Sequence, residues 1–213
     1  MVRPSPILFG LSVATILNDV SLTVLPRDLN VVELWSGVFA VGTAAMSAGF
    51  KARPFDIDRL PGVTDVQEGP LCENILLRDG FLRAVRLVLR LAPGGLLVLA
   101  PVCSSMGFAN SSRCRRSHSN PRGDTTYQSV RNGNAMALTC EFLLTLACQR
   151  GVRVVIENPP NSWLWVLLVA SLIALHTDES TVHRCTSDDS EPGLKYWKPY
   201  KFLAVSAESQ GAA

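Results

Sequence analysis

A chain of 213 residues is long enough for one domain with a sizeable core and short for two. Hydrophobic residues make up 47% of it and charged residues 18%, which excludes a wholly disordered chain. Because 20 basic and 18 acidic residues leave a net charge of only +2, the overall charge gives no argument for a nucleic-acid partner. Only local clustering of basic residues could provide one.

The beginning of the chain shows no clear hydrophobic period. We predict that residues 1–29 are an N-terminal extension and that one domain occupies residues 30–213. The apolar run at 7–17 is interrupted by Gly10 and lacks a clear cleavage site, so it is not typical of a signal peptide. The apolar run at 163–175 is shorter than the roughly 20 residues that cross a bilayer. It predicts a buried helix and no membrane partner.

Short apolar runs alternate with longer stretches of helical period along the rest of the chain. Strands are predicted over 31–35, 52–57, 96–100 and 152–156, and helices over 40–48, 75–91, 129–150 and 163–175. Two further strand-like runs, 181–186 and 201–206, close the chain. This alternation indicates an α/β fold with a mainly parallel sheet covered on both faces. We expect the run at 31–35 to be central and the last two runs to add an antiparallel edge hairpin.

Residues suited to chemistry follow four of the predicted strands. The carboxyl ends of parallel strands share one rim of the sheet, where ligands bind in such folds. The convergence of these strand ends therefore predicts a site. The four segments are 36–37, 56–58, 101–105 and 157–160.

The first two of these segments indicate a nucleoside-type cofactor. Ser36 and Gly37 form a turn between a strand and a helix, where a ligand can approach the backbone and the helix start favours an anion. Asp56 lies about 20 residues further along and suits the hydroxyls of a ribose. A plain tight turn and a solvated helix cap are the alternative interpretations.

The other two segments carry a thiol and a carboxyl group. Cys103 lies where the third predicted strand leaves the core, ahead of an arginine-rich loop, and is a candidate nucleophile. Glu157 ends the fourth strand, where partial burial can make a carboxyl group an acid or a hydrogen-bond acceptor. The alternatives are a buried structural thiol and a helix cap. All six cysteines lack a Cys-x-x-Cys spacing, so we interpret them as reduced thiols of an intracellular protein, nuclear or cytoplasmic.

The stretch 101–125 is rich in Ser, Arg, Asn, Pro and Gly and predicts a long loop, a feature that is often functional. Its arginines indicate contacts to the phosphates of DNA or RNA, with a solvated basic loop as the alternative. No second pair of ligands accompanies Cys114 and His118, so no metal site is predicted. The arginines are Arg113, Arg115, Arg116 and Arg122.

Taken in order, these motifs resemble those of the C5-cytosine methyltransferases over about residues 31–162. The segments 34–37 and 48–50 are similar to the first cofactor motif of that family. Asp56 occupies the position of the acidic residue that binds the ribose in that family. Pro101-Val102-Cys103 is similar to the Pro-Pro-Cys nucleophile loop, and Glu157-Asn158-Pro159 to the Glu-Asn-Val motif. The resemblance implies a Rossmann-like methyltransferase fold with S-adenosylmethionine as cofactor.

The resemblance also implies roles for individual residues. Cys103 would be the nucleophile and Glu157 its acid partner, while Trp35 would stack on the adenine. Either Asp65 or Asn74 would fill the adenine-contacting position. The cofactor-binding residues that the resemblance implies are Trp35, Ser36, Gly37, Asp56, Asp65 or Asn74, and Pro101.

The sequence departs from the family at several points. Phe39 stands where the family has the second glycine of its cofactor loop, and Val102 replaces the second proline. No Gln-x-Arg-x-Arg motif follows Glu157, and no segment has the usual size of a target-recognition domain. Two functions are therefore predicted side by side. One is a cytosine methyltransferase acting on DNA or RNA, and the other is a catalytically degenerate module of the same fold that binds nucleic acid or a protein partner.

Overall fold

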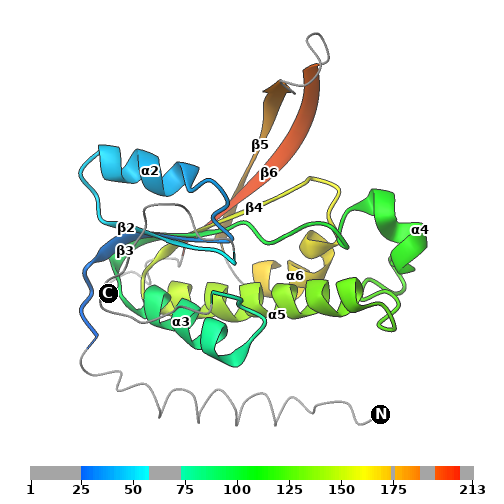
Figure 1. The fold of residues 1–213 in the computed structure, drawn as a ribbon, viewed down its shortest axis with the longest axis horizontal. Coiled ribbons are helices and arrows are strands. Elements are labelled where there is room, and N and C mark those ends of the chain that lie inside the picture. Colours follow the sequence, from blue (N-terminus) through cyan, green and yellow to red (C-terminus); the bar gives the residue numbers. More distant parts are fainter. Residues whose placement is uncertain (1–24, 58–72, 174–175, 188–194, 207–213) are drawn as a thin grey trace.

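The computed structural model describes residues 25–57, 73–173, 176–187 and 195–206, which form a six-stranded sheet with helices on both faces (Figure 1). The strands are β1 (Leu29–Leu34), β2 (Ala52–Phe55), β3 (Leu91–Leu99), β4 (Arg153–Asn158), β5 (His176–Ser187) and β6 (Lys195–Ser206). The helices are α2 (Ala40–Ser47), α3 (Arg78–Leu89), α4 (Ser111–Cys114), α5 (Gln128–Gln149) and α6 (Trp163–Ile173), with a short 3₁₀ turn, η1 (Phe108–Asn110).

The strand order is β2-β1-β3-β4-β6-β5. The first four strands in this order are parallel, and β6 runs antiparallel between β4 and β5. The predicted α/β class is confirmed, with a Rossmann-like, mainly parallel sheet and an antiparallel edge hairpin. The prediction that residues 31–35 form the central strand was wrong. β3 and β4 are central, because only β2 lies beyond β1 in the described part of the chain.

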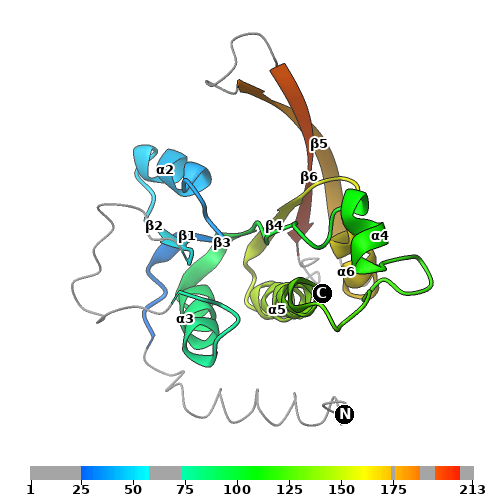
Figure 2. The same cartoon turned by 45° about the vertical axis from the view of Figure 1, so that its right-hand side comes forward.

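The two faces of the sheet are covered unequally (Figures 1 and 2). α3, α5 and α6 pack on one face, where the large apolar core lies. Side chains alternate along a strand, so Val32 and Leu34 join this core while Glu33 faces α2 on the other side. α2 is short, and Gly42 is its only buried residue. The face that carries Glu33 is therefore the thinner layer.

Three predicted elements have different bounds in the structure. The strand predicted over 96–100 begins earlier, at Leu91, and β3 contains an irregular stretch, because the partner of Leu29 is Leu91 whereas that of Val31 is Leu96. The two final strands are longer than predicted and are paired with each other over their whole length. β4 pairs with β6 only as far as Asn158 and Lys201, so the far half of the hairpin projects past the rim of the sheet (Figures 1 and 2).

Four cysteines fall in the part of the chain whose side chains are described, and all four are free thiols. Cys114, Cys140 and Cys148 are buried, whereas Cys103 is partly exposed. Burial raises the pKa of Cys140, which keeps this thiol neutral. Cys103 is therefore the cysteine of this group that a solute can reach. Most of the predicted N-terminal extension lies outside the described residues, and none of the described helices could span a membrane.

Candidate functional site

The ends of the parallel strands are joined beyond their regular pairing. The Ala100 N–H donates to the Leu34 carbonyl at 3.2 Å, which joins the ends of β3 and β1. The Asn158 side chain donates to the Pro101 carbonyl at 2.8 Å, which joins the ends of β4 and β3. Asn158 is buried. The predicted convergence of strand ends is therefore present as a hydrogen-bonded rim.

The glycine turn and Asp56 lie together at this rim. The Gly37 N–H donates to Asp56 Oδ2 at 2.8 Å, and Gly37 has a φ of 49° that suits a residue without a side chain. The preceding Trp35 is also left-handed, with a φ of 56°, and its N–H donates to the Phe55 carbonyl at 2.8 Å. The turn is thus held against the end of β2.

Two further residues complete this part of the rim. Ser36 is 6% exposed, and its Oγ has no hydrogen-bond partner among the described residues. Glu73 accepts the Asp56 N–H at 3.3 Å, so the start of the segment before α3 lies beside the end of β2. Asn74 follows Glu73, and its Oδ1 accepts the Leu76 N–H at 3.1 Å. Asp65, the other candidate for adenine contact, lies outside the described residues.

Phe39 closes the other end of the glycine turn. It is 3% exposed and left-handed, with a φ of 55°, a conformation that is unfavourable for a bulky residue. A methyl group on Gly42 would collide with the Phe39 ring, so the ring lies directly on the first turn of α2.

The Glu33 carboxyl group accepts a backbone hydrogen bond from the first turn of α2. Its Oε2 accepts the Gly42 N–H at 2.8 Å. Burial raises the pKa of Glu33, and the backbone N–H groups of Gly42 and Val41 oppose this rise. At Ser36, Gly37 and Asp56 the rim carries an orphaned hydroxyl and a carboxylate, which are polar groups of the kind that an adenosyl group needs. The start of α2, where an anionic tail would otherwise bind, is filled by the protein's own side chains.

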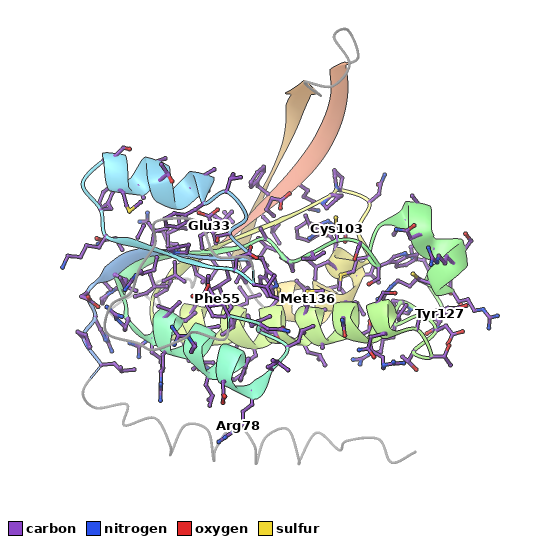
Figure 3. The ribbon with its side chains drawn as sticks, in the orientation of Figure 1. Glu33, Phe55, Arg78, Cys103, Tyr127 and Met136 are labelled. Atoms are coloured by element: carbon purple, nitrogen blue, oxygen red, sulfur yellow. The ribbon has the colours of Figure 1, made fainter. Side chains whose placement is uncertain are left out.

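Cys103 lies on the tight turn that leaves β3 (Figure 3). Its carbonyl accepts the N–H groups of Met106 and Gly107 at 2.9 and 3.0 Å. The neighbouring Val102 is 52% exposed, so this turn stands open to solvent on one side. A partly exposed thiol on a hydrogen-bonded turn is accessible and yet fixed in position.

Glu157 lies on the neighbouring strand. Leu99 and Ile156 are partners in the pairing of β3 and β4, so Glu157 follows at the level of Ala100. Ile156 points into the core, and alternation therefore places Glu157 on the face of Glu33. Burial raises the pKa of Glu157, and its Oε1 is buried without a hydrogen-bond partner in the described chain. Burial thus opposes ionisation of this carboxyl group, which also has an unused polar atom.

Backbone hydrogen bonds unite the loop of Cys103 with the loop that follows Glu157. The Phe108 N–H donates to the Asn161 carbonyl at 3.1 Å, and the Trp163 N–H donates to the Met106 carbonyl at 2.8 Å. The stretch 101–125, predicted as an irregular loop, is thus anchored and contains both η1 and α4. Met106 in this stretch is fully buried. A methionine in a polar stretch was the sequence signal for this packing, because methionine is usually buried.

The four arginines of this stretch are placed differently from one another. Arg116 is 3% exposed, and its guanidinium donates to the Ser105 carbonyl at 2.8 Å and to Asn134 Oδ1 at 3.0 Å. Burial lowers the pKa of Arg116. The prediction that Arg116 contacts phosphate is corrected, because its donors face carbonyl and amide oxygens inside the protein. Arg113 and Arg115 are exposed, and Arg115 lies 3.3 Å from an oxygen of Asp124.

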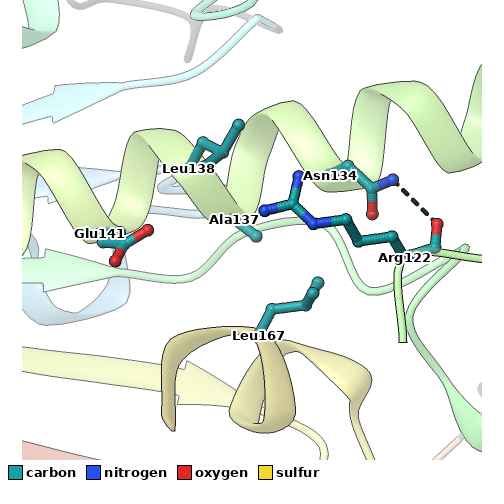
Figure 4. A pocket seen from close by; sticks show the side chains of 6 residues that line it. All are labelled: Arg122, Asn134, Ala137, Leu138, Glu141 and Leu167. Atoms are coloured by element: carbon teal, nitrogen blue, oxygen red, sulfur yellow. Dashed lines mark hydrogen bonds between the residues drawn. The ribbon is translucent and has the colours of Figure 1, made fainter. Parts of the chain in front are cut away.

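Arg122 lies at a shallow hollow between α5 and α6 (Figure 4). The hollow has a volume of about 250 Å³, including space open to solvent. Asn134 Nδ2 donates to the Arg122 carbonyl at 2.9 Å, which fixes the loop on α5. Neither Cys103 nor Glu157 belongs to the lining of this hollow. The lining residues are Arg122, Asn134, Ala137, Leu138, Glu141 and Leu167.

An aromatic cluster beside the Cys103 turn was not predicted from the sequence. The Phe108 and Trp163 rings lie 4.3 Å apart between centroids, and the His118 ring lies 5.3 Å from Trp163. Trp163 lies far along the chain from the loop that holds Phe108 and His118, so no local pattern indicated their contact. In the described residues, no group of three or more His, Cys, Asp and Glu side chains could hold a metal ion.

The fold and the rim define a Rossmann-like α/β protein with a glycine turn and an acid on one side and a thiol and a carboxyl group on the other. No family model matches the chain, and neither does any curated protein. It is similar to solved structures of the Dnmt2 methyltransferase of S. pombe, at 16% identity and a TM-score of 0.45, and of the Entamoeba histolytica methyltransferase EhMeth, at 14% identity and 0.45.

These two likenesses cover 84% and 86% of the chain but 50% and 55% of the other proteins, so the chain spans about half of their length. A third, to a precorrin-6y C5,15-methyltransferase from Geobacter metallireducens, has 10% identity and a TM-score of 0.33 over 90% of this chain and 84% of that one. At these values no function is inferred from the likeness.

Proposed function

We propose that the protein is an S-adenosylmethionine-dependent C5-cytosine methyltransferase that acts on DNA or RNA. The observation that carries this proposal is the placement of Glu157 near the end of β4 and of Cys103 on the turn that follows the neighbouring β3, two segments that the hydrogen bond from Asn158 to the Pro101 carbonyl holds together. Neighbouring parallel strands lie about 4.8 Å apart, so groups at their ends can contact the same small ring. The thiol and the carboxyl group are the two groups that this chemistry needs.

The chemistry assigns each group a role. C5 of cytosine is a weak nucleophile, and addition of the Cys103 thiolate at C6 would make the ring electron-rich enough to take a methyl group at C5. A neutral Glu157 would donate a hydrogen bond to ring N3 and so stabilise the charge that develops there. Burial raises the pKa of Glu157, which favours this neutral form. Water would then take the C5 proton, and the electrons of the C5–H bond would reform the C5–C6 double bond, expel the thiolate from C6 and release the product.

The glycine turn would hold the cofactor. Asp56 would hold the ribose hydroxyls, and Trp35 would stack on the adenine. Ser36 and Gly37 would contact the cofactor from the turn. When bound, S-adenosylmethionine supplies the methyl group as an electrophile. The orphaned Oγ of Ser36 is consistent with a polar ligand at this turn.

A 5-fluorocytosine oligonucleotide tests the proposal. The fluorine blocks the final elimination, so in the presence of S-adenosylmethionine we expect a covalent adduct that denaturing electrophoresis detects. Cys103→Ser should form none, because a hydroxyl is a far weaker nucleophile near neutral pH. Cys148→Ser, at a buried cysteine of α5, is the control and should form the adduct. Absence of any adduct on DNA and RNA, with cofactor binding demonstrated, would overturn the proposal.

A second candidate function is a catalytically degenerate module that binds nucleic acid or a protein partner. The buried Phe39 favours it, because the ring lies where the glycine turn meets α2. A calorimetric titration with S-adenosylmethionine separates the two candidates. Measurable binding supports the enzyme, and the absence of binding in a protein that still binds nucleic acid supports the module.

A further inference from the structure

Two exposed rings stand beside the turn of Cys103. Phe108 is 41% exposed and is tilted by 36° against Trp163, which is 3% exposed. The exposed His118 meets Trp163 at 67° and lies 6.3 Å from Phe108, nearly perpendicular to it. Trp163 thus forms a buried base beneath two rings that solvent reaches. An exposed aromatic ring held in this way offers a flat apolar surface at the rim.

This arrangement is fixed to the loops of the candidate active site. Trp163 Nε1 donates to Ser111 Oγ at 2.8 Å, and Asn110 Nδ2 donates to the Ser104 carbonyl at 2.6 Å. The Phe108 N–H is bound to the loop that follows Glu157. Phe108, which follows Cys103 by five residues in the chain, therefore has a set position relative to it. Such preorganisation lowers the entropy cost of binding a ligand.

The charge around the rings suits a polyanion. The segment 101–131 contains five arginines and a single acidic residue, Asp124. Arg116 is buried and its guanidinium binds oxygens of the protein itself. Arg113 on α4 and Arg115 immediately after α4 are both exposed. Aromatic side chains next to exposed arginines form the combination that binds single-stranded nucleic acids, because bases stack on the rings and phosphates contact the guanidinium groups.

We propose that Phe108, with His118 nearly perpendicular beside it, forms a stacking site for an unpaired nucleotide next to the target cytosine, with Arg113 near its phosphate. In a duplex both faces of a base are covered by its neighbours, whereas an unpaired base can place one face on a protein ring. The substrate class is therefore a single-stranded segment of nucleic acid. This inference rests on the proposed function for the role of the neighbouring cytosine, but the stacking site itself binds without cofactor or turnover.

Fluorescence anisotropy with a labelled single strand of about 12 nucleotides, and with the same strand in a duplex, tests the site at low salt without cofactor. We expect the wild type to prefer the single strand. Phe108→Ala should weaken single-strand binding by about 5- to 150-fold, the range for loss of one stacked base. Phe108→Trp should retain it. Tyr127→Ala is the matched control, because Tyr127 is 43% exposed in the same segment and lies apart from Cys103 (Figure 3).

A variant that keeps the packing on Trp163 separates loss of the aromatic face from loss of packing. Phe108→Leu retains an apolar side chain but removes the aromatic face, so it should lose affinity as Phe108→Ala does. Equal binding by the wild type and Phe108→Leu, or a preference for the duplex, would overturn the stacking site. An adduct without any effect of Phe108 substitutions defeats only the stacking site, and stacking without an adduct defeats only the proposed enzyme.

Discussion

At the scale of single residues, Asp56 is the clearest test of the cofactor site. Its carboxylate already accepts the Gly37 N–H, so the side chain has a set position at the turn. We expect Asp56→Ala to weaken binding of S-adenosylmethionine by about 1–3 kcal/mol, the range for polar groups that lose a buried partner. Calorimetry measures this change. Asp79→Ala, at an exposed acid of α3, is the control, and equal affinity of the Asp56 variant and the wild type would remove Asp56 from the site.

Phe39 makes a second prediction at the same scale. Phe39→Gly removes the ring from Gly42, and glycine adopts a positive φ without strain. We expect S-adenosylmethionine to bind at least about tenfold more tightly to this variant, or about 1.4 kcal/mol. Adenosine, which lacks the amino-acid tail, should bind equally to both proteins. An unchanged affinity for S-adenosylmethionine would show that Phe39 does not obstruct the tail.

At the scale of elements, Arg116 anchors the stretch 101–125 to α5. Its guanidinium reaches the Ser105 carbonyl and Asn134, so Arg116→Met leaves buried acceptors without a donor. We expect the free energy of unfolding to fall by about 2–4 kcal/mol, since each unmet buried group costs about 1–3 kcal/mol. Urea denaturation measures this. Arg115→Met should change stability little, because that side chain is 72% exposed.

The adjacent arginines also show where prediction from sequence ends. Arg115 and Arg116 are identical in type, yet one is exposed and the other buried, because Arg116 meets Asn134 eighteen residues away. No local pattern contains that contact. By contrast, the long apolar period over 129–150 predicted α5 almost to the residue, since its own side chains determine which face is buried.

The same distinction holds for the candidate site. The meeting of the glycine turn with Asp56, and of the Cys103 turn with the end of β4, could be predicted because parallel strands necessarily end at one rim. The Phe108–Trp163 contact depends on how the loop folds back, and the sequence contained only the apolar character of the loop as a signal. Topology was therefore predictable, while the packing of loops on the rim was not.

At the scale of the whole molecule, buried carboxyl groups determine how stability depends on pH. Burial raises the pKa of Glu33 and of Glu157 above the ordinary value of 4.5. Between that value and the raised ones, the folded protein binds more protons than the unfolded chain, so the free energy of unfolding falls as pH rises. The pKa of Asp28 is shifted in the opposite direction, so its effect on the pH dependence of stability is also opposite. Its hydrogen bond and ion pair with Arg90 lower its pKa below 3.8, so its contribution is lost as pH falls through the lowered value.

These opposite signs predict that the two sets of carboxyl groups together favour greatest stability in the mildly acidic range, near the two ordinary values of 3.8 and 4.5. Glu157→Gln tests the contribution of the candidate active site, because glutamine keeps the shape of the side chain but cannot ionise. Urea denaturation of the wild type and the variant across pH 3 to 8 should give curves that separate above about pH 4.5, with the variant losing less stability. Curves that remain parallel would show that Glu157 ionises in the folded protein as easily as in the unfolded chain. That result would also remove the neutral acid on which the proposed catalysis depends.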